Sequence, residues 1–140
     1  MKIGIDFDNT IVSYDKLFYT AAVEKKLIPV EMLPIKSSIR NYLRSINKED
    51  DWTELQGYVY GKKMPSAEIY PGVDLFFRKA LQYGFELFII SHKTLYPFKG
   101  PKFNLHEAAK SWLLEQSFIT NDISWNFELT LKEKLNVIFL

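Results

Sequence analysis

The chain has 140 residues, 47 % of them hydrophobic and 25 % charged, as is usual for one soluble globular domain. Its net charge of +1 gives no electrostatic argument for binding a nucleic acid polymer or an anionic membrane. The lack of cysteine excludes disulfides and thiolate metal sites. No apolar run approaches about 18 residues, and Met1-Lys2 leads directly into a predicted strand, so we expect a cytoplasmic protein. Nothing in the sequence indicates an oligomeric state.

The first twelve residues, MKIGIDFDNTIV, predict an apolar strand that runs into two carboxylates. Because one residue separates Asp6 from Asp8, we expect both side chains on the same side of the strand. Such a strand is normally buried on both faces, where an unpaired carboxylate costs several kcal/mol. A divalent cation is the usual compensation. The alternative, that Asp8-Asn9-Thr10 is only a turn, leaves Asp6 unexplained.

The next segment predicts three helices, over residues 15–27, 35–46 and 50–60. We expect Ser37 or Ser38 near the start of the second helix, and Asp50 and Asp51 to cap the third. These helices fall between the first strand and the next strand–helix unit. Residues 14–69 are therefore expected to form a helical cap, inserted above the sheet at the Asp6 end.

The pattern of a sheet protein resumes at residue 70. Pro71 suits the first turn of a helix, and Gly84 suits its left-handed C-terminus. Residues 85–90 then form a second apolar strand, which is followed by a helix over 104–116 and a strand over 123–127.

This order predicts an α/β fold, a Rossmann-like doubly wound parallel sheet whose core is residues 1–13 and 70–140. Ligands of such sheets bind beyond the carboxyl ends of the strands. Asp6, Asp8 and Ser91 all fall at such ends, which predicts one site there.

The segment Asp6-Phe7-Asp8-Asn9-Thr10-Ile11-Val12 resembles the Asp-x-Asp-x-Thr signature of the haloacid dehalogenase superfamily, whose commonest members are magnesium-dependent phosphatases. The resemblance implies that Asp6 is the nucleophile, forming an aspartyl phosphate, and that Asp8 is the general acid. It also implies that Asp6 and the Asp8 carbonyl bind Mg²⁺. Thr10 would hold the turn at the phosphate-binding end.

Two further motifs of this family concern the phosphoryl group. Ser91, after the second core strand, matches the residue that hydrogen-bonds it. A lysine that offsets the clustered negative charge is either Lys132 or Lys134. We favour Lys134, just inside the start of an expected final helix, although lysines on an exposed first turn are routine.

A long loop over residues 94–103 follows His92 and Lys93, which we expect to bind the substrate beside the phosphate. The alternative is a solvated basic loop with Tyr96 and Phe98 packed underneath. His106, on an expected helix, is assigned a structural role.

The chain departs from the family after Lys134, because residues 135–140 contain no acid where the family places two further carboxylates. The leading hypothesis is a magnesium-dependent phosphohydrolase acting on a small phosphorylated metabolite. The alternative is a non-catalytic or truncated domain that keeps the fold but lacks a complete metal site. Mutase- or phosphonatase-type chemistry is less favoured, because Asp8 supplies the acid that phosphatases need.

Overall fold

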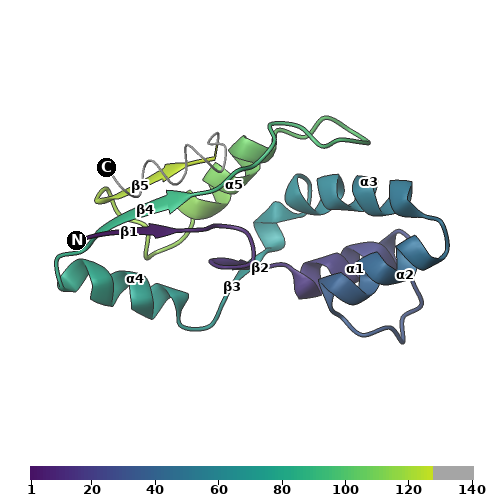
Figure 1. The fold of residues 1–140 in the computed structure, drawn as a ribbon, viewed down its shortest axis with the longest axis horizontal. Helices are drawn as coiled ribbons and strands as arrows, with labels where there is room; N and C mark the ends of the chain where they lie inside the picture. Colours follow the sequence, from purple (N-terminus) through teal and green to yellow (C-terminus); the bar gives the residue numbers. More distant parts are fainter. Residues whose placement is uncertain (128–140) are drawn as a thin grey trace. The chain divides into compact units, whose positions relative to one another are not determined.

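The computed structural model of the chain describes residues 1–127, which form two compact units (Figure 1). The first unit comprises Met1–Ser13, Glu68–Thr94 and the described residues from Lys110 onward. The second comprises Tyr14–Ala67 and Leu95–Ala109. Residues 95–109, which the sequence analysis placed in the core, thus belong with the inserted helices. No helix of the described residues is long and apolar enough to cross a membrane.

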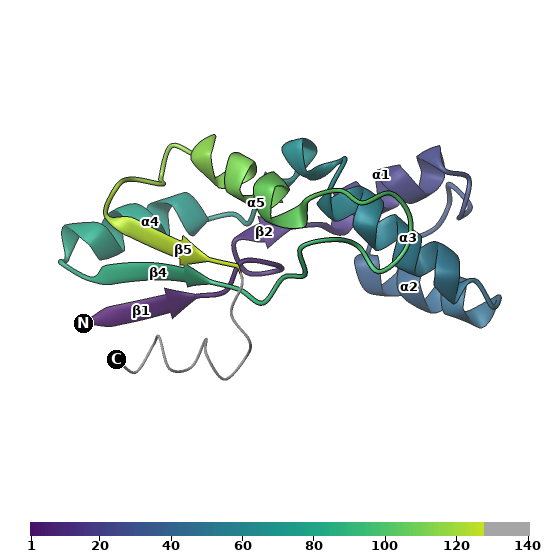
Figure 2. The ribbon, with the colours of Figure 1, turned by 90° about the horizontal axis from the view of Figure 1, so that it is seen from above.

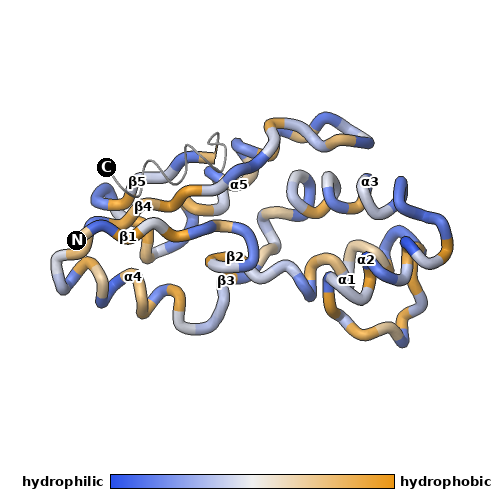
Figure 3. The backbone as a smooth tube through the Cα atoms, in the orientation of Figure 1, coloured by the Kyte–Doolittle hydropathy of each residue, from blue (hydrophilic) through white to orange (hydrophobic). Residues whose placement is uncertain are grey.

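A three-stranded parallel sheet forms the centre of the first unit, so the expected α/β class is confirmed. The central strand β4 (Glu86–Ile90) lies between β1 (Lys2–Ile5) and β5 (Ile123–Asn126), as Figure 2 shows. Helix α4 (Val73–Gln82) packs against β4. Hydrophobic residues concentrate along β4 (Figure 3), and Leu87, Ile89 and Ile90 are buried.

Strand β1 is shorter than the sequence analysis expected. It ends at Ile5, so the alternation expected to put Asp6 and Asp8 on the same side does not extend to them. Only the last residue of the strand is buried. The expectation of a strand buried on both faces is therefore wrong for the described residues.

A second, two-stranded sheet was not predicted. Strand β2 (Val12–Ser13) pairs antiparallel with β3 (Glu68–Ile69), and the Tyr70 N–H donates to the Ile11 carbonyl at 3.0 Å. Strands of two residues are too short to leave a periodic signal. Their pairing brings together the two ends of the segment 14–67.

Helix α4 begins later than expected. Its N-cap is Gly72, whose φ of 89° lies in the left-handed region, so Pro71 precedes the helix instead of lying in its first turn. The expected C-terminus is confirmed: Gly84 has a φ of 82°, and the Phe85 N–H donates to the Ala80 carbonyl at 3.0 Å.

The second unit contains three helices that contact one another in pairs: α1 (Asp15–Glu24), α2 (Lys36–Ser45) and α3 (Glu49–Tyr60). A short 3₁₀ helix η1 (Met64–Ser66) follows, and helix α5 (Leu105–Leu114) runs from this unit into the first. The centre of the three-helix group is aromatic, with the Phe18 ring stacked on Trp52 at 5.1 Å. The three predicted helices are thus confirmed, with ends within three residues of those expected.

Ser37 and Ser38 lie near the start of α2, as expected, whereas the expected N-caps of α3 are wrong. The first N–H of α2, from Lys36, donates to the Asp15 side chain at 2.9 Å, and no side chain of α2 caps it. Helix α3 has Lys48 at its N-cap, which places Asp50 and Asp51 inside the first turn. There their charges still complement the positive end of the helix dipole.

The loop over residues 95–103 packs on α3 through two glycines. A side chain at Gly57 would contact Pro97, and one at Gly61 would contact Phe103. Lys99 also pairs with Asp50 at 2.5 Å. The alternative of a loop resting on Tyr96 and Phe98 is wrong, because Phe98 is 83 % exposed.

We expect Gly57→Ala to destabilise the second unit by about 1–3 kcal/mol, the usual cost of overpacking. The added Cβ would lie 2.5 Å from the Pro97 Cβ, and this collision outweighs the better helix propensity of alanine. Denaturant unfolding followed by circular dichroism measures the effect. In the Gly57→Ala/Pro97→Gly double variant most of the loss should be recovered; an equal or greater loss there would exclude the collision as its cause.

Candidate active site

Phe7 fixes the segment that carries the two predicted catalytic carboxylates. Its fully buried ring meets Trp112 edge-on at 5.7 Å and Phe127 edge-on at 5.1 Å. Trp112 lies on α5 and Phe127 directly follows β5. One apolar side chain therefore holds the backbone between Asp6 and Asp8 against two elements of the first unit.

The Phe7 carbonyl also organises the turn that follows. It accepts hydrogen bonds from the N–H groups of Thr10, Ile11 and Val12 at 3.3, 3.0 and 3.2 Å. Asn9 adopts a φ of 60°, a left-handed conformation that asparagine tolerates better than most residues. The Thr10 backbone lies in this turn and the residue is exposed, while the role expected of its side chain stays a prediction.

Asp6 lies just beyond β1 and is exposed. Its carboxylate accepts the Phe7 N–H at 2.8 Å. The burial cost that suggested a compensating cation is therefore absent at Asp6. Exposure instead makes its carboxylate accessible to a ligand from solvent.

Asp6 and Thr10 share a cavity of about 550 Å³ in the first unit. The remaining lining is mostly apolar and comes from β1, from Ile11, and from residues 70–73, 76 and 77. A carboxylate and a hydroxyl on an otherwise apolar wall suit a small molecule with one polar group.

Asp8 is bound by Lys93, a pairing that the sequence analysis did not predict. The Lys93 Nζ donates to both carboxylate oxygens of Asp8, at 3.1 and 3.0 Å. The Lys93 side chain is only 4 % exposed and that of Asp8 25 %. The same ammonium lies 5.7 Å from the centre of the Phe7 ring, a cation–π distance.

The strand end that carries Lys93 also carries Ser91 and His92. Ser91 is 2 % exposed, and its N–H donates to the Asn126 carbonyl at 3.0 Å. His92 is exposed to solvent, whereas Lys93 is buried. Of the two expected substrate-binding residues, only His92 is thus on the surface. Lys132 and Lys134, the candidates for the charge-offsetting lysine, lie outside the described residues.

A signal for the Lys93–Asp8 pair was present in the sequence. Both residues directly follow core strands, and β1 and β4 are parallel neighbours with Ile5 opposite Ile89. The carboxyl ends of neighbouring parallel strands lie at the same edge of a sheet. A charged residue that follows one of these strands is then close to the residues that follow its neighbour.

Asp6 and Asp8 are the residues that a magnesium ion beside β1 would use, and Mg²⁺ in proteins usually keeps several waters besides one or two carboxylates. Mg²⁺ takes six oxygen ligands in near-octahedral geometry. Residues 1–127 contain no group of three or more His, Cys, Asp or Glu side chains placed to hold a metal. Asp6 and Asp8 remain as donors, and the Asp8 carboxylate already accepts two hydrogen bonds from Lys93.

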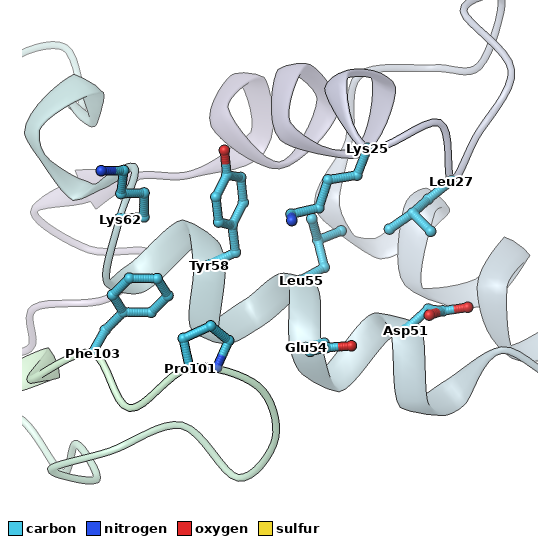
Figure 4. A pocket seen from close by; sticks show the side chains of 9 residues that line it. All are labelled: Lys25, Leu27, Asp51, Glu54, Leu55, Tyr58, Lys62, Pro101 and Phe103. Carbon is cyan, nitrogen blue, oxygen red and sulfur yellow. The ribbon is translucent and has the colours of Figure 1, made fainter.

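A separate cavity of about 680 Å³ lies within the second unit and contains none of the predicted site residues (Figure 4). It is lined by Leu27, Leu55, Tyr58, Pro101 and Phe103, together with two lysines and two carboxylates, Lys25, Lys62, Asp51 and Glu54. The Tyr58 hydroxyl donates to Glu24 at 2.7 Å, and Lys63 pairs with Glu24 at 2.9 Å. The hydrogen bond from Lys63 holds the pKa of the Glu24 carboxyl below its ordinary value.

No family model, curated protein or solved structure matches this chain. The functional assignment therefore depends on the Asp6–Thr10 motif and on the geometry around it.

We expect Phe7→Ala to destabilise the first unit by about 3–5 kcal/mol, as other large-to-small aromatic core changes do. The change removes both edge-on ring contacts and leaves a cavity beneath the two carboxylates. Urea unfolding monitored by tryptophan fluorescence measures it, since Trp112 contacts the deleted ring. Phe98→Ala, on the surface, serves as the control; equal losses in the two variants would contradict the anchoring role of Phe7.

Proposed function

We propose that this chain is a phosphohydrolase of the haloacid dehalogenase type with a Rossmann-like core, acting on a small phosphorylated metabolite. The observation that supports it best is the pair of differently placed carboxylates after β1. Asp6 is exposed beside a cavity, and Asp8 is held by a buried lysine. A nucleophile must be reachable, whereas a proton-transferring group must be held in position.

In the proposed reaction an Asp6 carboxylate oxygen attacks phosphorus, and the bond from phosphorus to the ester oxygen breaks. Asp8, in its protonated form, gives its proton to that leaving oxygen and becomes a carboxylate, beside the Lys93 ammonium. Water then attacks the phosphorus of the aspartyl phosphate, the Asp8 carboxylate takes up a proton from that water, and the bond from phosphorus to the Asp6 oxygen breaks. Asp6 and inorganic phosphate are released. Dividing one difficult displacement into two easier ones is the usual advantage of covalent catalysis.

Electrostatics support a role for the positive charge at this site. Two carboxylates repel a phosphate dianion, and phosphoryl transfer needs that charge neutralised. Lys93 supplies one cation, 3.0 Å from Asp8. In the proposal Ser91, Thr10 and Lys134 bind the phosphoryl group, and His92 contacts the remainder of the substrate.

A second function, phosphate binding without turnover, is favoured by two specific observations. Residues 1–127 contain no group of three or more His, Cys, Asp or Glu side chains that could hold a metal, and Ser91 is almost fully buried. Such a domain would bind inorganic phosphate and show no hydrolysis. Turnover assays of the wild-type chain distinguish the two functions.

We expect Asp6→Asn to reduce turnover of p-nitrophenyl phosphate by a factor on the order of 10³ or more, because the amide is not a nucleophile. The substitution keeps the size of the side chain, so the melting temperature should change little. Asp122→Asn makes the same chemical change at an exposed position of the same unit and should keep full activity. Retained activity in purified Asp6→Asn would exclude the aspartyl-phosphate mechanism.

We expect the 140-residue chain to bind Mg²⁺ only weakly, with a dissociation constant of about 1 mM or higher, because metal affinity depends strongly on the number of carboxylate ligands. Titration calorimetry at pH 7 measures it. The Asp6→Asn/Asp8→Asn variant, without either carboxylate, is the control for binding elsewhere. A micromolar dissociation constant in the wild type would show that further ligands complete the site.

A further inference from the structure

We propose that the cavity of the second unit binds a short apolar peptide with free ends, whose ammonium group pairs with Glu54 and whose carboxylate pairs with Lys25 and Lys62. The feature that points to this ligand is an apolar hollow that carries opposite charges along its length (Figure 4). The site uses none of the residues of the proposed phosphohydrolase, so it would be a second binding function of the chain.

The cavity follows one face of helix α3. Asp51, Leu55, Tyr58 and Lys62 line it at spacings of four, three and four residues, the spacing of side chains on one face of a helix. At 1.5 Å per residue, the stretch from Asp51 to Lys62 covers about 16 Å. An extended tripeptide spans about 10 Å. A peptide of this length therefore fits along the cavity, with its ends within reach of the charged side chains.

The walls of the cavity are apolar and held in place by the fold. The Tyr58 hydroxyl donates to Glu24 at 2.7 Å, which fixes the ring on one side. Phe103 lies against α3 at Gly61, where a larger residue would collide with it. Leu55, between these positions and the start of the helix, is buried. A preformed wall of this kind accepts an apolar side chain with little loss of conformational entropy.

The charges at the cavity are arranged for a ligand with one charge at each end. Glu54 lies one turn before Tyr58 and Lys62 one turn after it. Within residues 1–127, neither the Glu54 nor the Lys62 side chain has an ion-pair or hydrogen-bond partner. The Lys25 side chain extends from the end of α1 toward α3, and its ammonium lies 4.0 Å from the centre of the Tyr58 ring. Negative charge at one end and positive charge at the other complement the two ends of a peptide.

Titration calorimetry of the full chain at pH 7 with the tripeptide Ala-Phe-Ala measures the binding. We expect saturation at one site. Acetylation of the amino end, or amidation of the carboxyl end, should each lower the affinity about threefold, the usual contribution of one partly exposed ion pair. No binding at millimolar peptide, or equal affinities for the free and the doubly blocked peptide, would overturn the proposal.

Variants of the charged residues locate the peptide. Glu54→Gln should bind the free peptide about threefold more weakly and should no longer distinguish it from the acetylated one. Lys25→Met/Lys62→Met should instead become insensitive to amidation and keep its sensitivity to acetylation. An acetylation effect of unchanged size in Glu54→Gln would place the peptide elsewhere on the chain and refute the proposed site.

Two matched variants control for the change in net charge. Glu31→Gln and Lys99→Met make the same chemical changes in the second unit at positions that do not line the cavity. Both should leave the affinities for all the peptides unchanged, and losses equal to those of the cavity variants would contradict the proposal. If a variant fails to fold, the comparison of free and blocked peptides on the wild-type chain still decides. None of these measurements needs turnover, so their outcome is independent of Asp6→Asn.

Discussion

The burial of one aromatic side chain, Phe7, controls the geometry of the candidate site. Its ring is enclosed by Trp112 and Phe127, and its carbonyl accepts three N–H groups of the following turn. A residue fixed at both its side chain and its backbone leaves its neighbours little freedom. The backbone between Asp6 and Asp8 is consequently held in place by apolar packing.

That constraint gives two chemically identical side chains different surroundings. Asp6 is exposed on the wall of a cavity, whereas Asp8 accepts two hydrogen bonds from a nearly buried ammonium. Different environments are the general means by which proteins assign separate roles to paired carboxylates. In the proposed reaction the accessible carboxylate is the nucleophile and the restrained one moves protons. The buried charge of Lys93 is tolerated because Asp8 and the Phe7 ring both lie close to it.

The inserted helices form a unit with its own core, organised by aromatic contacts and by close packing on glycine. Phe18 stacks on Trp52, and Gly57 and Gly61 let the loop over residues 95–103 approach α3. This loop is distant in sequence from the helices, so helical periodicity did not associate it with them. Glycine in the middle of a helix costs stability by itself. Here the contact with Pro97 explains why α3 carries one.

The sequence by itself determined the elements and the ends of strands at which chemistry is expected, because periodic burial and turn residues act locally. It indicated α1, α2, α3 and the strands β1, β4 and β5, and it placed Asp6, Asp8 and Ser91 after those strands. Only the tertiary structure decided which side chains are exposed and which are paired. The exposure of Asp6, the capping of α2 by Asp15, and the Lys93–Asp8 pair each depend on residues far apart in the chain. Contacts of this kind are set by packing in three dimensions, which local sequence patterns do not encode.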